Sequence, residues 1–205
     1  MTRTHLHDAR GGFALWFTGL SGAGKTTIAR ILTGQMRNRG VPLEVLDGDV
    51  VRANLSPDLG FTKQDRDLNI RRIAFVSQLL VRNGVGVIVA AISPYREERE
   101  IARSIVGPDR FIEVFVDAPL EICIQRDVKG LYARALAGEI QHFTGISDPY
   151  EAPMAPHLVL PTNLEMPEET AARVLSYLEQ EGWLPAARGS RAEGEPAPRV
   201  SARAG

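Results

Sequence analysis

The fold is decided by the stretch Gly19-Leu20-Ser21-Gly22-Ala23-Gly24-Lys25-Thr26, which matches the pattern G-x-x-x-x-G-K-[ST] of a phosphate-binding loop. An apolar run at residues 13–18 precedes it and predicts a strand, and residues 25–39 follow it with the apolar spacing of a helix. Glycines let the backbone wrap closely round a polyphosphate, while N–H groups and the helix N-terminus attract its negative charge. The sequence therefore predicts an ATP or GTP binder.

The two residues that close this loop have separate expected tasks. Lys25 is expected to reach the β- and γ-phosphates, and the hydroxyl of Thr26 is expected to bind Mg²⁺. The competing interpretation is a glycine-rich turn with a solvated lysine. The residues expected around the nucleotide are Gly19, Leu20, Ser21, Gly22, Ala23, Gly24, Lys25, Thr26 and Thr27.

Strands and helices alternate along the rest of the chain. Further apolar strands are expected at residues 41–46, 85–91, 111–116 and 157–160, and helices at 68–83, 95–105, 120–126 and 167–181. The strands are apolar throughout and not at every second residue, which is typical of a buried parallel sheet. The fold class is therefore α/β, with a parallel sheet flanked by helices on both faces in three layers.

Composition divides the chain into three parts. Residues 13–185 are expected to form one globular domain that contains the phosphate loop, interrupted by a polar, glycine-containing flap at about residues 128–150. Residues 1–12 form an N-terminal extension. Residues 186–205 are rich in Ala, Arg, Gly, Glu, Ser and Pro, and we expect a disordered tail.

Charge and cysteine content limit the partners. The 205 residues carry 24 basic and 25 acidic side chains, so the sequence lacks the field of a general nucleic-acid binder. Residues 1–12 lack the apolar core of a signal peptide, and no apolar run is long enough for a membrane span. The lone Cys123 has no partner for an internal disulfide. We expect a cytoplasmic protein that binds neither nucleic acid nor membrane.

Acidic residues follow the second expected strand as Asp47-Gly48-Asp49, with Arg52 one turn later. Ligands of doubly wound folds bind at the carboxyl ends of strands, where these carboxylates could orient an acceptor hydroxyl, accept its proton or hold Mg²⁺. Helix capping is the alternative for Asp47, and both roles are compatible. The strand at residues 85–91 ends without an acid, unlike a mechanical ATPase, and the T-K-x-D match at residues 62–65 lies too early for a GTPase.

Eight motifs taken in order make residues 12–185 resemble the adenylylsulfate kinase family. Beside the phosphate loop, they are Asp47-Gly48-Asp49-Val50-Val51-Arg52, Leu59-Gly60-Phe61, Asn69-Ile70-Arg71-Arg72, Ile92-Ser93-Pro94, Phe115-Val116-Asp117-Ala118-Pro119, Arg126-Asp127-Val128-Lys129-Gly130-Leu131-Tyr132 and Phe143-Thr144-Gly145-Ile146. The resemblance implies ATP-dependent phosphorylation of the 3′-hydroxyl of adenylyl sulfate, which gives 3′-phosphoadenylyl sulfate and ADP in sulfate assimilation.

The resemblance also implies residue roles. Asp49 would lie nearest the acceptor hydroxyl, and Lys25, Ser93 and Lys129 would complete the catalytic set. The acceptor would be held by Arg52, Phe61, Arg66, Asn69, Ile92 and Ser93, and by the flap residues Lys129, Gly130, Leu131, Phe143, Thr144 and Gly145. Arg126 and the turn at Thr162 would flank the adenine of ATP, and Thr26, Asp47 and Asp49 would hold Mg²⁺.

Some alternatives stay open at this point. The family often assigns Ser93 as a transient phosphoryl acceptor, whereas a direct in-line transfer needs no such residue and no base adjoins Ser93 in the sequence. The chain could also phosphorylate another small metabolite, such as a sugar acid or nucleotide, or be an idle nucleotide-binding module. The resemblance further implies a homodimer and a functional link to ATP sulfurylase.

Overall fold

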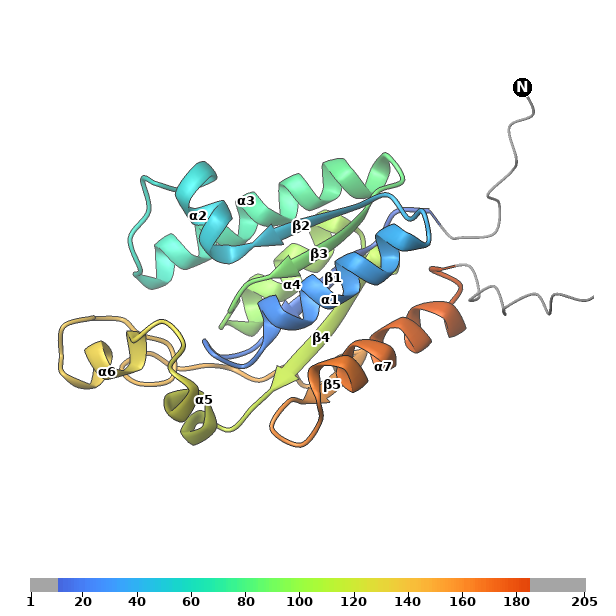
Figure 1. The fold of residues 1–205 in the computed structure, drawn as a ribbon. Helices are drawn as coiled ribbons and strands as arrows, with labels where there is room; N and C mark the ends of the chain where they lie inside the picture. Colours follow the sequence, from blue (N-terminus) through green and yellow to red (C-terminus); the bar gives the residue numbers. More distant parts are fainter. Residues whose placement is uncertain (1–10, 185–205) are drawn as a thin grey trace, which may run out of the picture.

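The computed structural model describes residues 11–184. The expected tail and most of the expected N-terminal extension lie outside these residues. Five parallel strands form one sheet in the order β2-β3-β1-β4-β5 (Figure 1). Their bounds are β1 Ala14–Thr18, β2 Leu43–Asp47, β3 Gly86–Ala90, β4 Phe111–Asp117 and β5 Leu158–Pro161. The predicted parallel sheet is confirmed.

Helices cover both faces of this sheet (Figure 1). Their bounds are α1 Lys25–Asn38, α2 Gly48–Leu55, α3 Lys63–Arg82, α4 Arg96–Val106, α5 Leu120–Arg126, α6 Leu131–Leu136 and α7 Pro167–Gln180, with a 3-10 turn at Pro108–Arg110. The described residues therefore form the predicted three layers.

The central strand β1 shows why helices must pack against both faces of the sheet. All five of its residues are buried, and Ala14 pairs with Val87 of β3 on one side and Phe111 of β4 on the other. Successive side chains of a strand point to opposite faces. Leu15 accordingly joins the core beneath α1 and α7, whereas Trp16 joins the core beneath α3 and α4.

Helix α3 begins five residues before the predicted start because Thr62 and Asp65 form a capping box. The Thr62 hydroxyl accepts from the Asp65 N–H, and the Asp65 carboxylate accepts from the Thr62 N–H. The T-K-x-D match is thus the start of a helix. Helices α2 and α6 were not predicted as elements of their own.

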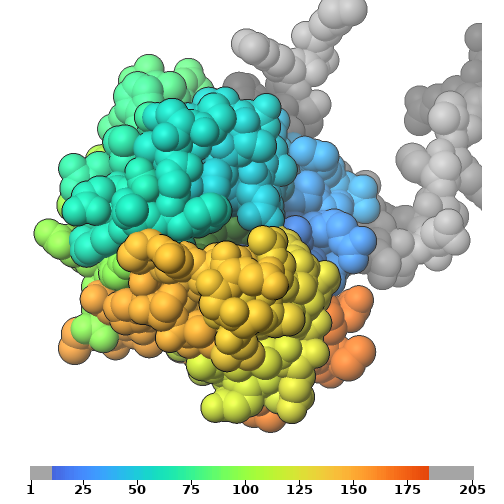
Figure 2. Space-filling view, turned by 90° about the vertical axis from the view of Figure 1, so that its left-hand side faces the viewer, coloured from blue at the N-terminus to red at the C-terminus, as the bar shows by residue number. Residues whose placement is uncertain are grey.

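The carboxyl ends of the strands meet at one edge of the sheet, beside α2, α5 and α6 (Figure 1). Figure 2 shows this edge from outside, with α2 and the start of α3 in cyan to teal on one side of a hollow and the flap in yellow to orange on the other. Among the described helices, none combines the length and apolar character that a membrane span requires.

Candidate active site

A cavity of about 1070 Å³ lies at this edge of the sheet. It is lined by the phosphate loop, the β2–α2 junction, the start of α3, the segment after β3, the flap and the β5–α7 turn. The predicted site residues that line it are Ser21, Gly22, Gly24, Lys25, Thr26, Thr27, Asp47, Asp49, Arg52, Phe61, Arg66, Asn69, Ile92, Ser93, Arg126, Lys129, Leu131, Phe143, Thr144 and Thr162. Gly19, Leu20, Ala23, Gly130 and Gly145 lie outside this lining.

The phosphate loop depends on glycine at two positions. A Cβ at Gly19 would lie 2.4 Å from the carbonyl oxygen of Val116, so no side chain fits there. Gly24, which precedes α1, has φ 106°, a conformation that other residues rarely adopt. The loop consequently follows the sheet edge closely and delivers the chain directly into the N-terminus of α1.

The Lys25 ammonium is folded back onto its own loop. Its Nζ donates to the carbonyl oxygens of Gly19 at 2.8 Å and Leu20 at 2.7 Å. Burial lowers the pKa of Lys25 to about 8, an effect only partly opposed by the nearby carboxylates of Asp47 and Asp49. A buried ammonium with so low a pKa favours an anionic ligand, because added negative charge would stabilise its protonated form.

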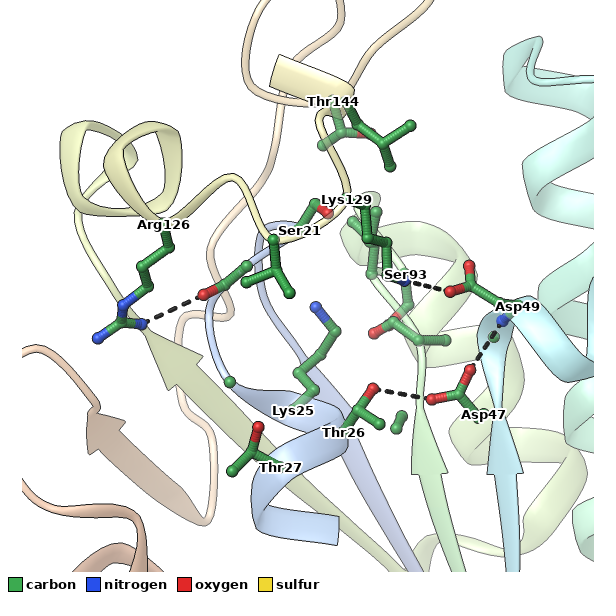
Figure 3. Close-up of a pocket in the computed structure, with 18 of the residues that line it drawn as sticks. Ser21, Lys25, Thr26, Thr27, Asp47, Asp49, Ser93, Arg126, Lys129 and Thr144 are labelled. Carbon is green, nitrogen blue, oxygen red and sulfur yellow. Dashed lines mark hydrogen bonds and ion pairs between the residues drawn. The ribbon is translucent and has the colours of Figure 1, made fainter. Parts of the chain in front are cut away.

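Thr26 and Asp47 present a pair of oxygen ligands. The Thr26 hydroxyl donates to Asp47 Oδ2 at 2.8 Å, while Asp47 Oδ1 caps α2 by accepting from the Asp49 N–H at 3.0 Å (Figure 3). Mg²⁺ binds to one or two carboxylates and takes its other ligands from phosphates and water. Residues 11–184 hold no cluster of three or more His, Cys, Asp or Glu side chains suited to a metal. The oxygen pair therefore fits Mg²⁺ that arrives with a nucleotide.

Across the cavity, Asp49 of α2 forms an ion pair with Lys129 of the flap (Figure 3). Both side chains are more than half exposed, so the pair is readily screened and contributes little stability. It does join α2 to the flap across the cavity, and it places two groups of opposite charge beside the phosphate loop.

An aromatic ring and two arginines form the side of the cavity beneath α2 and α3. The Phe61 ring is half exposed and lies 4.6 Å from the Arg52 guanidinium and 5.7 Å from that of Arg66. Arg66 Nε donates to the Phe61 carbonyl at 3.0 Å, and Arg52 Nη1 donates to Gly60 O at 2.6 Å. Burial lowers the pKa of both arginines, and the like charge of Arg66 adds to this effect at Arg52. This arrangement suits a ligand with a flat ring and an anionic group.

Two buried polar atoms among the cavity-lining residues lack a hydrogen-bond partner. They are Asn69 Oδ1 on α3 and Thr144 Oγ1 on the flap. Leaving such an atom buried and unpaired costs about 1–3 kcal/mol, so a side-chain movement that paired either atom with a bound ligand would be favourable.

Ser93 lies at the floor of the cavity in a strained conformation. Its φ is 40°, and its Oγ accepts from Trp16 Nε1 at 3.1 Å. The Ser93 side chain is buried, and its own O–H faces the Ala91 carbonyl oxygen at 3.4 Å. The hydroxyl is thus held by protein groups on both sides.

The flap docks onto the phosphate loop through Tyr132, a residue for which the sequence predicted no role of its own. The Tyr132 hydroxyl donates to the Ser21 carbonyl at 2.9 Å, and its ring meets that of Phe143 edge-on at 5.0 Å. The Asp127 carboxylate caps α6 by accepting from the N–H groups of Tyr132 and Ala133. An aromatic residue two positions after Gly130 was the available signal.

Arg126 and Thr162 meet at the other end of the loop. Arg126 Nη2 donates to the Thr162 carbonyl at 2.7 Å, Arg126 Nη1 donates to the Gly22 carbonyl at 3.2 Å, and the Thr162 hydroxyl donates to the Ala23 carbonyl at 2.7 Å. These bonds tie the β5–α7 turn to the phosphate loop. Asn163 of the same predicted turn also lines the cavity there, together with Glu165 and Met166, which the sequence did not single out.

Comparison with known proteins gives one consistent result. Residues 11–161 match the family model described as adenylylsulphate kinase. The adenylyl-sulfate kinase of Halothermothrix orenii is 57% identical over 173 residues, which cover 84% of this chain and 92% of that protein. The structure of the Mycobacterium tuberculosis APS kinase CysC in complex with AMPPNP and APS superposes with a TM-score of 0.79 at 46% identity, covering 82% of this chain and 98% of that one. The hexameric APS kinase from Thiobacillus denitrificans is 36% identical with a TM-score of 0.66, over 85% of this chain and 30% of that one.

Proposed function

The chain belongs to the adenylylsulphate kinase family, and on this premise we propose that it transfers the γ-phosphoryl group of ATP to the 3′-hydroxyl of adenylyl sulfate. One observation carries the proposal. A single cavity joins a phosphate loop to an aromatic and arginine pocket, with Asp49 and Lys129 between them. A phosphoryl donor and a nucleotide acceptor can therefore face each other across two groups of opposite charge.

ATP takes the side of the cavity formed by residues 19–27. The loop N–H groups and the N-terminus of α1 surround the phosphates, and Lys25 exchanges its two carbonyl partners for phosphate oxygens. Thr26 and Asp47 would hold Mg²⁺, with Asp49 adding negative charge close by, and the ion would neutralise charge on the phosphates. Arg126 and the turn at Thr162 flank the adenine.

Adenylyl sulfate takes the opposite side. Its adenine stacks on Phe61, and its phosphosulfate group meets Arg52 and Arg66, whose guanidiniums can pair bidentately with oxyanions. Asn69 and Thr144 supply the two buried oxygens that lack a partner. Ile92 and Ser93 form the floor. The flap residues Leu131 and Phe143 complete the walls, with Gly130 and Gly145 shaping the turns behind them.

Transfer needs a positioned hydroxyl and charge stabilisation. Asp49 orients the 3′-hydroxyl and accepts its proton as the oxygen bonds to the γ-phosphorus and the bond to ADP breaks. Lys129 leaves Asp49 and places its charge near the transferred group. The Ser93 hydroxyl is already engaged by Trp16 and Ala91, which favours direct in-line transfer over a phosphoserine intermediate.

The flap has a second task, which is to exclude water. Hydrolysis would waste ATP, and a closed, dry site also strengthens the electrostatic interactions within it. The contacts of Tyr132 with Ser21 and Phe143 support a flap that closes over both ligands.

The activity is tested by ADP release from Mg·ATP with adenylyl sulfate, AMP, gluconate or no acceptor. We expect turnover with adenylyl sulfate alone, and its loss by a factor of at least about 100 in Asp49→Ala. Asp58→Ala is the matched control, because Asp58 is an exposed carboxylate paired with Arg72 outside the cavity. Preference for gluconate would point to another acceptor, and acceptor-independent hydrolysis would refute the assignment of the acceptor side.

We further propose that the protein is a cytoplasmic homodimer with a functional link to ATP sulfurylase. The family resemblance and the assembly of the hexameric relative support self-association, and the lone buried Cys123 is compatible with a reducing compartment. Light scattering at micromolar concentration would give the mass, and a monomer would contradict the dimer.

A further inference from the structure

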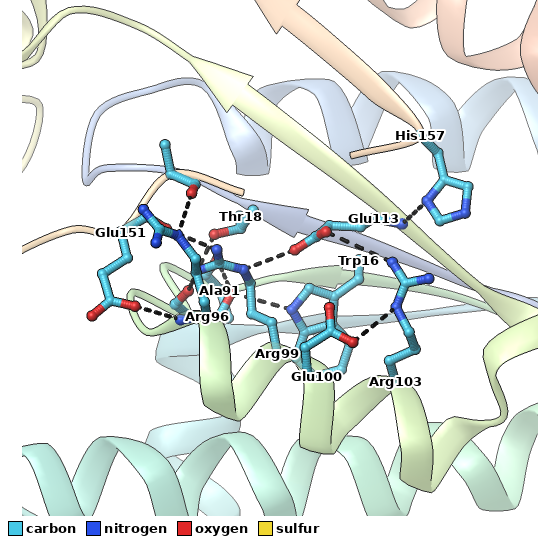
Figure 4. A network of polar contacts seen from close by, with 12 residues as sticks. Trp16, Thr18, Ala91, Arg96, Arg99, Glu100, Arg103, Glu113, Glu151 and His157 are labelled. Atoms are coloured by element: carbon cyan, nitrogen blue, oxygen red, sulfur yellow. Dashed lines mark hydrogen bonds and ion pairs between the residues drawn. The ribbon is translucent and has the colours of Figure 1, made fainter. Parts of the chain in front are cut away.

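A buried polar network lies beneath the acceptor side of the cavity, with Arg99 of α4 at its centre (Figure 4). The Arg99 side chain is 2% exposed. Its Nε donates to Glu113 Oε1 at 2.8 Å, its Nη1 to the Ser93 carbonyl at 2.8 Å and its Nη2 to the Glu151 carbonyl at 2.7 Å. One guanidinium thus joins three segments that are far apart in the sequence.

The first of these segments holds Ser93, whose backbone needs outside support. A residue other than glycine at φ 40° keeps this conformation only where its surroundings fix it. Trp16 holds the Ser93 side chain, and the hydroxyl of Thr18 lies 3.2 Å from the Ser93 carbonyl that Arg99 also binds. Arg99 supplies the charged hydrogen bond in this set.

The second segment is the base of the flap at residues 150–152. The Glu151 N–H donates to the Pro94 carbonyl at 2.9 Å, so the chain leaving the flap pairs with the residue that follows Ser93. The Tyr150 hydroxyl lies 2.9 Å from Thr18 Oγ1, and the Glu151 carboxylate accepts from the Arg96 N–H at the start of α4. The cavity floor and the flap base therefore share one set of supports.

The third segment is β4, where Glu113 fixes the guanidinium. The Glu113 side chain is 6% exposed, and its other oxygen lies 3.8 Å from Arg103 Nη2. The Glu113 N–H donates to His157 Nδ1, which ties β4 to the start of β5. Neither Arg99 nor Glu113 lines the cavity, so this pair can act on a ligand only through the segments that it holds.

From this geometry we propose that Arg99 is a positioning residue for the acceptor substrate, and that it fixes residues 92–94 relative to the base of the flap. The proposal rests on the proposed function for the identity of that substrate. On the nucleotide side, the phosphate loop is tied to Arg126 and the β5–α7 turn, and Arg99 hydrogen-bonds to none of these segments. The loop meets residue 92 through one long hydrogen bond, from the Gly19 N–H to the Ile92 carbonyl at 3.4 Å. A defect at Arg99 should consequently change the KM for adenylyl sulfate much more than the KM for Mg·ATP.

Arg99→Lys tests this directly, because lysine keeps the charge while losing the fixed fork of donors. We expect the KM for adenylyl sulfate to rise about tenfold and the KM for Mg·ATP to stay within about twofold. Arg103→Lys is the matched control, since Arg103 lies one turn further along α4 and near the same carboxylate but contacts neither Ser93 nor Glu151. Equal changes in both KM values in Arg99→Lys would show a merely structural role and overturn the proposal.

A second readout does not depend on the substrate. Lys129 and Arg134 are exposed trypsin sites within the flap. In the ligand-free protein we expect Arg99→Lys to be cut there several times faster than wild type, and Arg103→Lys to be cut at the wild-type rate. If the wild-type protein failed to use adenylyl sulfate, the proposed function would fall while this comparison still tested Arg99.

A second variant, Tyr150→Phe, keeps the proposal testable if Arg99→Lys does not fold. It removes the hydrogen bond to Thr18 but keeps the ring, which stacks on Phe115 with centroids 6.0 Å apart. We expect a smaller change in the same two readouts. If Arg99→Lys folds, the proposal is refuted by wild-type flap cleavage and wild-type KM values in both variants. If Arg99→Lys does not fold, wild-type values in Tyr150→Phe alone refute it.

Discussion

Raising the pH should weaken nucleotide binding through Lys25. Burial lowers the pKa of this ammonium to about 8, against 10.5 for an ordinary lysine. Between pH 8 and pH 10.5 the unfolded chain therefore holds a proton that the folded chain has lost. Below pH 8 the buried charge lowers the free energy of unfolding of the ligand-free protein by up to about 3 kcal/mol, and this loss disappears as the pH rises through that range. The buried Lys25 ammonium thus destabilises the ligand-free protein, but it provides a positive charge where we expect the phosphates to bind.

The size of the binding effect follows from the same pKa. If only protonated Lys25 binds the phosphates, the apparent dissociation constant is inversely proportional to the protonated fraction, and it rises about eightfold between pH 7.5 and pH 9. A lysine with an ordinary pKa would give almost no change over this range. The terminal phosphate of ATP is already ionised there and adds little.

Calorimetric titration with Mg·AMPPNP measures both the affinity and the proton uptake. In buffers of different ionisation enthalpy, we expect uptake of about 0.2 proton per nucleotide at pH 7.5 and about 0.9 at pH 9. Lys25→Arg is the control, because a guanidinium stays charged and should give a flat profile even where overall affinity falls. Constant affinity and no proton uptake in the wild type up to pH 9.5 would refute the reasoning.

Four substitutions, one of them a control, test other parts of the structure. Gly19→Ala should destabilise the protein by about 3 kcal/mol or more, because its Cβ would lie 2.4 Å from the Val116 carbonyl oxygen. Gly34→Ala is the control, since Gly34 lies in open space on α1, and it should stabilise the protein by up to about 1 kcal/mol. Urea unfolding measures the free energy of unfolding of both variants, and equal changes would contradict the predicted clash at Gly19. Tyr132→Phe loses the hydrogen bond to the Ser21 carbonyl and should lower the free energy of unfolding by about 1 kcal/mol in the same experiment. Asn69→Ala should raise the KM for adenylyl sulfate about tenfold with little change for ATP, since Asn69 Oδ1 lacks a partner in the free protein; initial rates decide, and an unchanged KM would remove Asn69 from the acceptor site.

The sequence predicted the elements that carry a strong periodic or motif signal. The apolar strands identified the sheet, and the glycine-rich motif identified a loop that lines the cavity. Helix α2 was not predicted because Gly48 and the β-branched Val50 and Val51 are poor helix formers. Asp47, just before the helix, supplies its N-terminal cap. Helix α6 has six residues, too few for a helical period to show.

The site was predicted unevenly for a similar reason. The apolar side chain of Phe61 would by itself suggest a core residue, and only the family resemblance gave its ring a binding role; in the structure the ring is half exposed. Arg99, Glu113 and Glu151 meet across large separations in the chain, and no local pattern marks their contacts. Interactions of this kind depend on tertiary structure and cannot be read from spacing.

The central claim is that the phosphoryl group reaches the 3′-oxygen of adenylyl sulfate, and identification of the product by NMR tests it most directly. We expect one new phosphorus resonance coupled to the ribose H3′ proton, formed in equal amount with ADP and absent with Asp49→Ala. ADP without a phosphorylated acceptor, or phosphate attached at another position, would contradict the proposed reaction.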